Sequence, residues 1–322
     1  MIPSKILITG SSGYCGHFLA VHFAGLGIPV VGTDLRPHSA EREFPNFKFY
    51  DLDIRNKEVL KKIVEMEQPS HIIHLAYLMD PVHDPKYFYD VDVAGSKNAL
   101  EVANETSSVK QFILMSSTSA YGAFPDNPDW MKEDRPLNPH DYTYGIHKKE
   151  VEEYYGQFQK RPDMKLVIFR MCTAVGPSYF KPGGVVSSVY HAPFLIEFFG
   201  GNGKIQFIHE DDVKAVFEKA AKDETMEGVF NLVPNDFSTT KELGGGLNKK
   251  FIPIPLPLLQ AVFWILWNLR IAQLTPAHAR LMAYGIVASP NKLMDRLGYR
   301  FKYSTKGAFM DAVEKRKALG RL

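Results

Sequence analysis

The feature that most constrains this chain is a short apolar run that leads directly into three glycines. Residues Ile6–Ile8 are apolar and end abruptly near glycine, which predicts a buried parallel strand. Gly10, Gly13 and Gly16 follow, and apolar positions of Tyr14–Leu26 recur at helical spacing. Such a strand, loop and helix form a phosphate cradle, because the helix N-terminus offers unpaired N–H groups and glycine permits close approach. An ordinary strand–helix turn is the alternative on this pattern alone.

A second apolar run, Ile28–Asp34, ends in a carboxylate about 20 residues past the glycines, where an acid accepts hydrogen bonds from ribose hydroxyls. A carboxylate there repels the additional phosphate of NADP. Asp34 therefore predicts NAD as the cofactor, with NADP less favoured. Arg36 moderates that preference, since its guanidinium can accommodate a phosphate.

The pattern that follows alternates strands with helices. Strands are expected at 47–51, 71–76, 110–117 and 165–171, and helices at 56–67, 86–106 and 141–159. This alternation predicts an α/β fold with a doubly wound parallel sheet of the Rossmann type. Ligands of such sheets bind at the C-terminal ends of the strands.

After Gly176 the alternation gives way to shorter, less regular elements rich in proline and glycine. With 322 residues, the chain is long enough for a second lobe. We expect an NAD-binding Rossmann domain in residues 1–176 plus about 204–232. A smaller C-terminal substrate-binding lobe is expected in 177–203 and 233–322.

Composition excludes several classes of protein. Hydrophobic residues make up 45% of the chain, enough for a sizeable core, and the net charge of +2 predicts no nucleic-acid partner. The only cysteines are Cys15 and Cys172, and Cys15 lies inside the glycine loop, where a disulfide would hinder a cofactor. Together with the absence of a signal-peptide pattern, this predicts a reduced, cytoplasmic setting.

One segment raises the question of a membrane. Ile254–Leu274 is apolar and aromatic around Trp264, but Pro255, Pro257 and Arg270 are among the residues that interrupt it. It falls short of the about 20 apolar residues that a span requires, so no transmembrane span is expected. We expect a buried or lid helix. A helix that contacts a membrane surface, or lines an apolar substrate entrance, is the alternative.

Tyr144 and Lys148 carry the predicted chemistry. Their i, i+4 spacing places the phenol and the ammonium on one helical face. A free tyrosine has a pKa near ~10, but a neighbouring lysine charge and an oxidised nicotinamide stabilise the phenolate. Proton abstraction from an alcohol then becomes feasible. The run Ser116–Gly122, at a predicted strand end, supplies hydroxyls that can hold the substrate oxygen.

These motifs occur in a recognisable order, which ends with Leu297-Gly298-Tyr299. Between the glycine loop and that end stand Asp34, Asp53-Ile54, His74-Leu-Ala76, Ser116-Ser117-x-x-x-Tyr121-Gly122, Tyr144-x-x-x-Lys148, Arg170-x-x-x-x-x-Gly176-Pro177 and Phe207-Ile208-His209-x-x-Asp212-Val213. The set resembles the extended short-chain dehydrogenase/reductases, the NAD-dependent epimerase/dehydratase family. The resemblance covers nearly the whole chain.

The resemblance implies particular roles. Tyr144 is implied as the catalytic acid/base, Lys148 as its activator and a ribose ligand, and Ser117 as the hydroxyl that positions the substrate. The implied cofactor-binding residues are Gly10, Ser12, Gly13, Tyr14, Gly16, Asp34, Asp53, Ile54, Leu75, Ala76, Tyr144 and Lys148. A homodimer is the usual outcome in the family.

Departures from the family pattern bear on which reaction and which substrate are expected. Dehydratases carry an Asp-Glu pair directly after the catalytic hydroxyl, where this chain has Thr118 and Ser119, so dehydration is not expected. Thr173 replaces an asparagine of the sugar-nucleotide enzymes, and Ile205-Gln206 stand where an arginine often binds the substrate diphosphate. Both changes count against a nucleotide sugar. Asp92 replaces a usual asparagine, with no consequence derivable from the sequence.

The histidines predict no metal site. His71 and His74 are three residues apart on a predicted strand, a spacing that points them to opposite faces. Structural roles are expected for both. His147 projects away from Tyr144 on the helix, and no role is assigned to it.

The main prediction is an NAD-dependent oxidoreductase that transfers hydride between nicotinamide and a secondary alcohol or ketone. The segment around Trp264 favours an apolar, hydroxysteroid-like small-molecule substrate. The first alternative is an isomerase, a nucleotide-sugar 4-epimerase that retains its NAD. The second is a non-catalytic NAD-binding scaffold or sensor.

Overall fold

The computed structural model describes residues 3–179, 184–198, 201 and 203–322, which form two compact units. The first unit comprises Met1–Ser116, His147–Arg170 and Lys214–Phe230, and the second comprises Ser117–Ile146, Met171–Val213 and Asn231–Leu322. Residues 117–146, which the sequence analysis grouped with the nucleotide-binding domain, fall in the second unit in this division. The domain boundaries given above stay a prediction.

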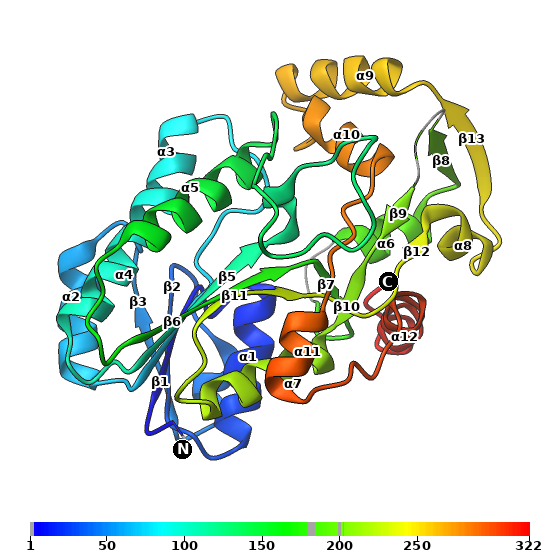
Figure 1. The fold of residues 1–322 in the computed structure, drawn as a ribbon. Helices are drawn as coiled ribbons and strands as arrows, with labels where there is room; N and C mark the ends of the chain where they lie inside the picture. Colours follow the sequence, from blue (N-terminus) through cyan, green and yellow to red (C-terminus); the bar gives the residue numbers. More distant parts are fainter. Residues whose placement is uncertain (1–2, 180–183, 199–200, 202) are drawn as a thin grey trace. The chain divides into compact units, whose positions relative to one another are not determined.

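A seven-stranded sheet forms the centre of the first unit (Figure 1). Its order is β3 (Phe47–Asp51), β2 (Val30–Asp34), β1 (Ile6–Thr9), β4 (His71–His74), β5 (Gln111–Ser117), β6 (Lys165–Met171) and β11 (Gly228–Leu232). All pairs from β3 to β5 are parallel, and Ile6 is in register with Val30 on one side and His71 on the other. The order reverses at β1, which confirms the doubly wound Rossmann-like fold.

Helices cover both faces of this sheet (Figure 1). On one face α2 (Lys57–Glu67), α4 (Gly95–Glu105) and α5 (Thr143–Gln157) share a core with alternate residues of the strands, such as Leu7 and Ile72. On the other, α1 (Tyr14–Gly25) and α7 (Glu210–Lys222) are joined by the hydrogen bond between His22 and Glu218, at 2.9 Å. The near-continuous apolar strands follow from burial on both faces.

The long helix expected at 86–106 is interrupted. The structure has α3 (Pro85–Tyr89), a π-helical turn η2 (Asp90–Ala94) and then α4. The Ser96 hydroxyl donates to the carbonyl oxygen of Asp92 at 2.5 Å, an insertion of the kind that opens a helical ladder. Single π-turns of this type are frequent at functional sites.

The second unit has shorter elements around its own core. Its strands are β7 (Thr173–Val175), β8 (Phe194–Phe198), β9 (Lys204–Ile205), β10 (Phe207–His209), β12 (Ser238–Thr239) and β13 (Lys250–Ile254), and they pair two by two. Its helices are α6 (Gly184–His191), α8 (Thr240–Gly245), α9 (Leu256–Asn268), α10 (Pro276–Ala283), α11 (Asn291–Leu297) and α12 (Thr305–Ala318). Short 3-10 turns occur at η1 (Ser39–Arg42) and η3 (Thr118–Tyr121) in the chain. The rings of Phe207 and Phe309 stack at 5.5 Å in the core beneath α12.

Helix α9 corrects one expectation. Leu259 and Phe263 are buried, but Trp264 is 59% exposed. Of the expected buried or lid helix, the fully buried form is wrong, and the lid stays a prediction. The helix carries apolar side chains on several of its sides. Among the described residues, only the side with Leu259 and Phe263 is covered by other parts of the second unit. In the part of the chain that the structure describes, no helix has the length and apolar character to cross a bilayer.

Candidate active site

The glycine loop between β1 and α1 is packed too tightly for side chains. Gly10 has φ +69°, and a Cβ atom there would lie 2.7–2.8 Å from backbone atoms of Ala76 and Leu75. A Cβ on Gly16 would lie 2.1 Å from the carbonyl oxygen of Gly10. Gly13, the N-cap of α1, leaves the helix end without a side-chain cap. The loop thus brings Gly10, Gly16 and the Leu75–Ala76 segment together under a helix end whose N–H groups suit a phosphate.

The acid at the end of β2 is tied to this loop. One carboxylate oxygen of Asp34 accepts a hydrogen bond from the backbone N–H of Ser12 at 3.1 Å. The other accepts from the N–H of Arg36 at 3.2 Å. The Ser12 hydroxyl donates to the carbonyl oxygen of Arg36 at 2.6 Å, which closes the arrangement. A carboxylate can accept from ribose hydroxyls, and the N–H groups of the neighbouring helix end can donate to a pyrophosphate, so these residues fit a dinucleotide.

A buried polar atom lies within the same loop. The Ser11 hydroxyl is buried and has no hydrogen-bond partner among the described residues. A Cβ on Gly32 would lie 2.7 Å from it, so β2 passes the loop closely. Buried hydroxyls normally have a hydrogen-bond partner, so Ser11 is unusual in this loop. The sequence analysis did not name it among the cofactor-binding residues.

The predicted adenine contacts are partly engaged within the protein. The Asp53 carboxylate accepts hydrogen bonds from the Arg55 guanidinium, at 2.5 Å and 3.0 Å, and this pairing lowers the pKa of Asp53. Ile54 is buried, and its side chain lies 2.7 Å from the position of a Cβ on Gly95. Both residues follow β3 in the first unit. Among the predicted cofactor-binding residues, Tyr144 belongs to the second unit in this division and the others to the first.

Tyr144 and Lys148 lie one turn apart on α5. Lys148 is 2% exposed, and its ammonium donates to the carbonyl oxygen of Met115 at 2.6 Å. The same nitrogen lies 2.9 Å from the centre of the Tyr77 ring. Burial lowers the pKa of Lys148 to about 7, against the opposing charges of Asp92 and Glu152. The lysine is therefore poised to change its charge near neutral pH.

Ser117 and Tyr144, the two predicted catalytic hydroxyl groups, belong to the second unit. The Ser117 hydroxyl caps the turn η3 by accepting from the N–H of Ser119 at 3.1 Å, and it lies 2.9 Å from the Ser119 hydroxyl. Tyr144 is half-buried, with its ring centre 5.9 Å from that of Tyr142. Tyr142 in turn meets the His278 ring edge-on at 5.2 Å.

A buried pair next to Lys148 was not predicted. Asp92 is fully buried in the π-turn η2, and it accepts from His147 Nδ1 at 3.0 Å and from the Leu78 N–H at 2.9 Å. Burial raises the pKa of Asp92, opposed by the hydrogen bond from His147. His147 therefore has a partner where sequence analysis assigned it no role. The unusual aspartate at position 92 was the signal that could have found the pair.

The histidines of β4 have separate partners. His74 Nδ1 lies 2.7 Å from the Thr9 hydroxyl and its Nε2 lies 2.9 Å from the Ser96 hydroxyl. Burial lowers the pKa of His74 to about 3 and that of His71 to about 4. Among the described residues, no group of three or more His, Cys, Asp or Glu side chains could hold a metal ion.

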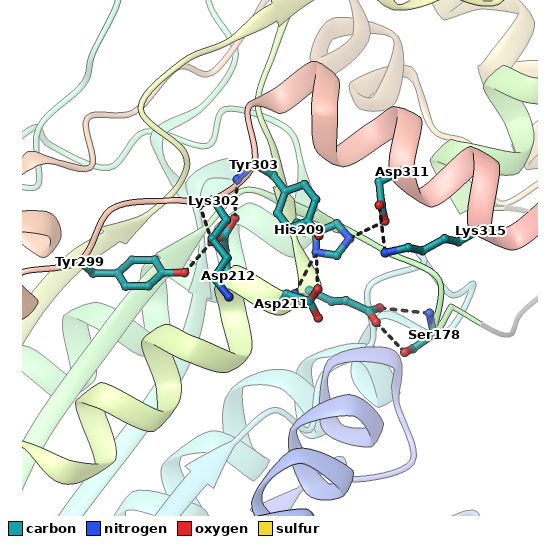
Figure 2. Close-up of polar contacts among 10 residues, drawn as sticks. Ser178, His209, Asp211, Asp212, Tyr299, Lys302, Tyr303, Asp311 and Lys315 are labelled. Carbon is teal, nitrogen blue, oxygen red and sulfur yellow. Dashed lines mark hydrogen bonds and ion pairs between the residues drawn. The ribbon is translucent and has the colours of Figure 1, made fainter.

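The family-like segment around His209 is a structural junction in the second unit (Figure 2). The Asp212 carboxylate accepts from the Tyr299 hydroxyl at 2.6 Å and from the Lys302 N–H at 2.9 Å. His209 stacks on Tyr303 at 3.9 Å, and its Nε2 lies 3.0 Å from the Asp311 carboxylate. The motif thus connects the start of α7 with the residues that precede α12 and with Asp311 inside α12.

One departure from the family has a structural explanation. The Gln206 side-chain amide is buried, and its nitrogen donates to the carbonyl oxygens of Pro234, Asp236 and Ala288 at 3.1–3.2 Å. Its oxygen accepts from the Ala288 N–H at 2.8 Å. Gln206 therefore crosslinks strands and loops, a role in which it has no capacity left for a diphosphate.

A family profile decides the class. The profile of the NAD dependent epimerase/dehydratase family matches residues 6–232. The chain belongs to this family. The predicted family is thereby confirmed, and with it the assignment as an enzyme of an NAD-dependent class.

Individual relatives are distant. An uncharacterized protein of Mycobacterium tuberculosis is 24% identical, over 96% of this chain and 83% of the relative. UDP-glucose 4-epimerase 2 of Oryza sativa is 28% identical over 58% of this chain and 46% of that enzyme. A solved Bordetella bronchiseptica enzyme in complex with NAD and UDP has a TM-score of 0.78 at 19% identity, covering 100% of this chain and 96% of its own. The hydroxysteroid-like substrate and the 4-epimerase alternative stay predictions at this point.

Proposed function

We propose that this protein is an NAD-dependent epimerase that inverts a secondary carbinol of a nucleotide-linked sugar and retains its NAD between turnovers. The observation that carries the proposal is the family match, combined with Tyr144 and Lys148 on one turn of α5. Characterised relatives include UDP-glucose 4-epimerases, and a structural neighbour was solved with NAD and UDP. The substrate diphosphate is assigned to groups other than Gln206, whose amide is saturated within the protein.

NAD is assigned to the first unit. Gly10, Ser12, Gly13, Tyr14 and Gly16 would hold its pyrophosphate, Asp34 its adenosine ribose, Asp53 and Ile54 its adenine, and Leu75 and Ala76 would line it. When bound, NAD supplies the acceptor and donor of a hydride. The chain would supply the proton transfer, which NAD does not perform.

Three side chains are assigned to that proton transfer. Tyr144 exchanges the hydroxyl proton of the substrate, and Ser117 donates a hydrogen bond to the substrate oxygen. Lys148, when protonated, stabilises the Tyr144 phenolate by its charge and lowers the cost of removing the phenolic proton. Thr118 and Ser119 stand where dehydratases carry acids, so water loss is not part of the proposal.

The test is an assay of UDP-glucose and UDP-galactose interconversion without added NAD, with absorbance at 340 nm recorded in parallel. We expect interconversion without net NADH, and we expect nucleotide to be released when the purified protein is denatured. Tyr144→Phe should reduce kcat by about 10²- to 10⁴-fold while the NAD content is unchanged. Tyr142→Phe, whose ring lies 5.9 Å from that of Tyr144, is the matched control and should retain activity.

Two outcomes contradict the proposal. Net NADH formation from an apolar secondary alcohol, with no sugar interconversion, restores the dehydrogenase reading. If Tyr144→Phe alters no activity toward any alcohol, ketone or sugar nucleotide, the scaffold reading holds instead. The homodimer and the cytoplasmic location predicted from the sequence stay predictions, to be tested by light scattering and by cell fractionation.

A further inference from the structure

Helix α9 and the residues that follow it expose an unusual set of large apolar side chains. This α9 apolar surface consists of Leu258 (57% exposed), Val262 (40%), Trp264 (59%), Ile265 (48%), Leu269 (64%) and Ile271 (66%). Single exposed apolar residues are common on proteins, but six within fourteen positions are not. The surface belongs entirely to the second unit.

The exposed residues follow helical geometry. Leu258, Val262, Ile265 and Leu269 are spaced as i, i+4, i+7 and i+11, so they form one stripe along α9. A side of the helix roughly 100° away from this stripe holds Leu259 and Phe263, which are buried beside Ala279 of α10. Figure 1 shows α10 along one side of α9. The helix therefore carries apolar residues on two sides. One side is buried in the second unit, and the other is exposed.

The charged residues within the segment that contains this surface have a single sign. Residues 243–294 contain no Asp or Glu, although the whole chain has 36 acids and 38 bases. The same segment carries Lys249, Lys250, Arg270, Arg280 and Lys292. Of these, Arg280 lies 3.6 Å from the Asp141 carboxylate and Lys249 donates to the carbonyl oxygen of Ala192 at 2.7 Å, so a partner of opposite charge would have to contact the other bases. Lys250 and Arg270 are exposed at the two ends of the β13–α9 segment. The nearest acid in β8, Glu197, lies 3.5 Å from Lys241 and is paired with it.

We propose that the α9 apolar surface docks this protein on an anionic membrane surface, lying in the interface without crossing the bilayer. Exposed leucine, isoleucine and tryptophan side chains enter the boundary between headgroups and acyl chains, and the bases contact anionic headgroups. Tryptophan suits this depth because its ring is apolar and its N–H is polar. A second copy of the chain fits less well, since two such segments would bring bases against bases.

The test uses the full chain, saturated with NAD, in flotation with vesicles of phosphatidylcholine alone or with 30% phosphatidylglycerol. We expect binding to the anionic vesicles, with a blue shift of tryptophan emission. The double variant Trp264→Gln, Ile265→Gln should reduce the apparent affinity about tenfold or more and abolish the shift. The control variant Met66→Gln, Leu319→Gln removes apolar residues that are 60% and 56% exposed elsewhere, and it should bind like the parent.

Several results would overturn the proposal. One is the absence of binding to either vesicle, and another is an equal loss of binding in the control variant. A third is binding that the α9 double variant leaves unchanged, which would mean general electrostatic attraction. A fourth is self-association in light scattering without vesicles that the α9 variant alone abolishes, because the surface would then pair two copies. The proposal is independent of the epimerase reaction, and none of these readouts measures turnover.

Discussion

The glycine loop of the first unit and helix α9 of the second differ in how tightly their residues are packed and in how far their side chains are exposed. At the loop, backbone atoms approach so closely that Gly10 and Gly16 have no room for a Cβ atom. On α9, large side chains such as Trp264 extend into solvent. The loop carries the family pattern, whereas α9 lies beyond residue 232, where the family profile ends. The loop that carries the family pattern therefore depends on close backbone packing. The feature outside the family profile is a set of exposed apolar side chains.

A second contrast concerns buried charge. The surroundings of Lys148 in the first unit include Asp92, His147 and Glu152, and each of these has a short polar contact. Glu152 is paired with Arg170 at 2.8 Å, both being almost fully buried. Segment 243–294 instead keeps its bases without acids. The buried charges around Lys148 thus have partners of opposite charge nearby in the sequence or the fold, whereas segment 243–294 supplies no acid of its own and its Arg280 pairs with Asp141 outside it.

The largest expected effect tests the tight packing of the loop. Gly10→Ala should cost about 3 kcal/mol or more in unfolding free energy and abolish NAD binding, because strain at φ +69° adds to a backbone clash at 2.7 Å. Gly27→Ala is the control: it has φ +78° but nothing within 4 Å of its Cβ, and it should cost about 1 kcal/mol. Urea denaturation and NAD titration measure both. Equal costs for the two variants would show that strain, and not close approach, constrains the loop.

The next effect concerns Lys148. Its pKa is lowered to about 7, so between pH 7 and about 10 the unfolded chain holds a proton that the folded chain lacks. Stability should therefore rise with pH in that window, by about 1 kcal/mol per pH unit from this residue. His71 and His74, with pKa values lowered to about 4 and 3, contribute below pH 6.5. Burial raises the pKa of the Cys172 thiol, so this residue opposes the rise in the upper part of the window.

Lys148→Met should flatten that rise when urea denaturation is repeated at pH 7, 8 and 9, and it should remove activity. Lys149→Met is the matched control, because Lys149 is 37% exposed and 3.4 Å from Glu153 at the surface. It should keep both the slope and the activity. A slope that persists in Lys148→Met would mean that Lys148 is not the titrating group.

A smaller effect tests the unpredicted pair. Asp92→Asn keeps an acceptor for the Leu78 N–H but removes a charge that raises the pKa of Lys148. The onset of the stability rise should move to lower pH by about one unit. Asp90→Asn, in the same π-turn but bonded to the exposed Lys86, should leave the onset in place. The same shift in both variants would assign the effect to the turn and not to Asp92.

The smallest effect returns to α9. Trp264→Gln should change the unfolding free energy by no more than about 0.5 kcal/mol, because this side chain extends into solvent. Phe263→Ala, one residue earlier and 7% exposed, should cost about 3 kcal/mol. Thermal denaturation without lipid measures both. A large loss for Trp264→Gln would mean that the ring stabilises the fold and is not reserved for a partner.

The sequence by itself determined the local and repeating features of this protein. The apolar strands, the glycines at positions 10, 13 and 16 and the acid at position 34 predict the Rossmann-like sheet, and its strand order agrees. They could be predicted because each depends on backbone geometry over a few neighbouring residues. The assignments of Tyr144, Lys148 and Ser117 came from the family pattern, and they await the variants described above.

Only the tertiary structure decided which side chains lose water. It placed Asp92 against His147, 55 positions apart, and it saturated Gln206 with partners up to 82 positions away. It also left Trp264 exposed on a helix expected to be either buried or a lid. Local periodicity states that a helix has an apolar side, but burial depends on which distant segments arrive to cover it. On α9 only one of two apolar sides is covered by the fold.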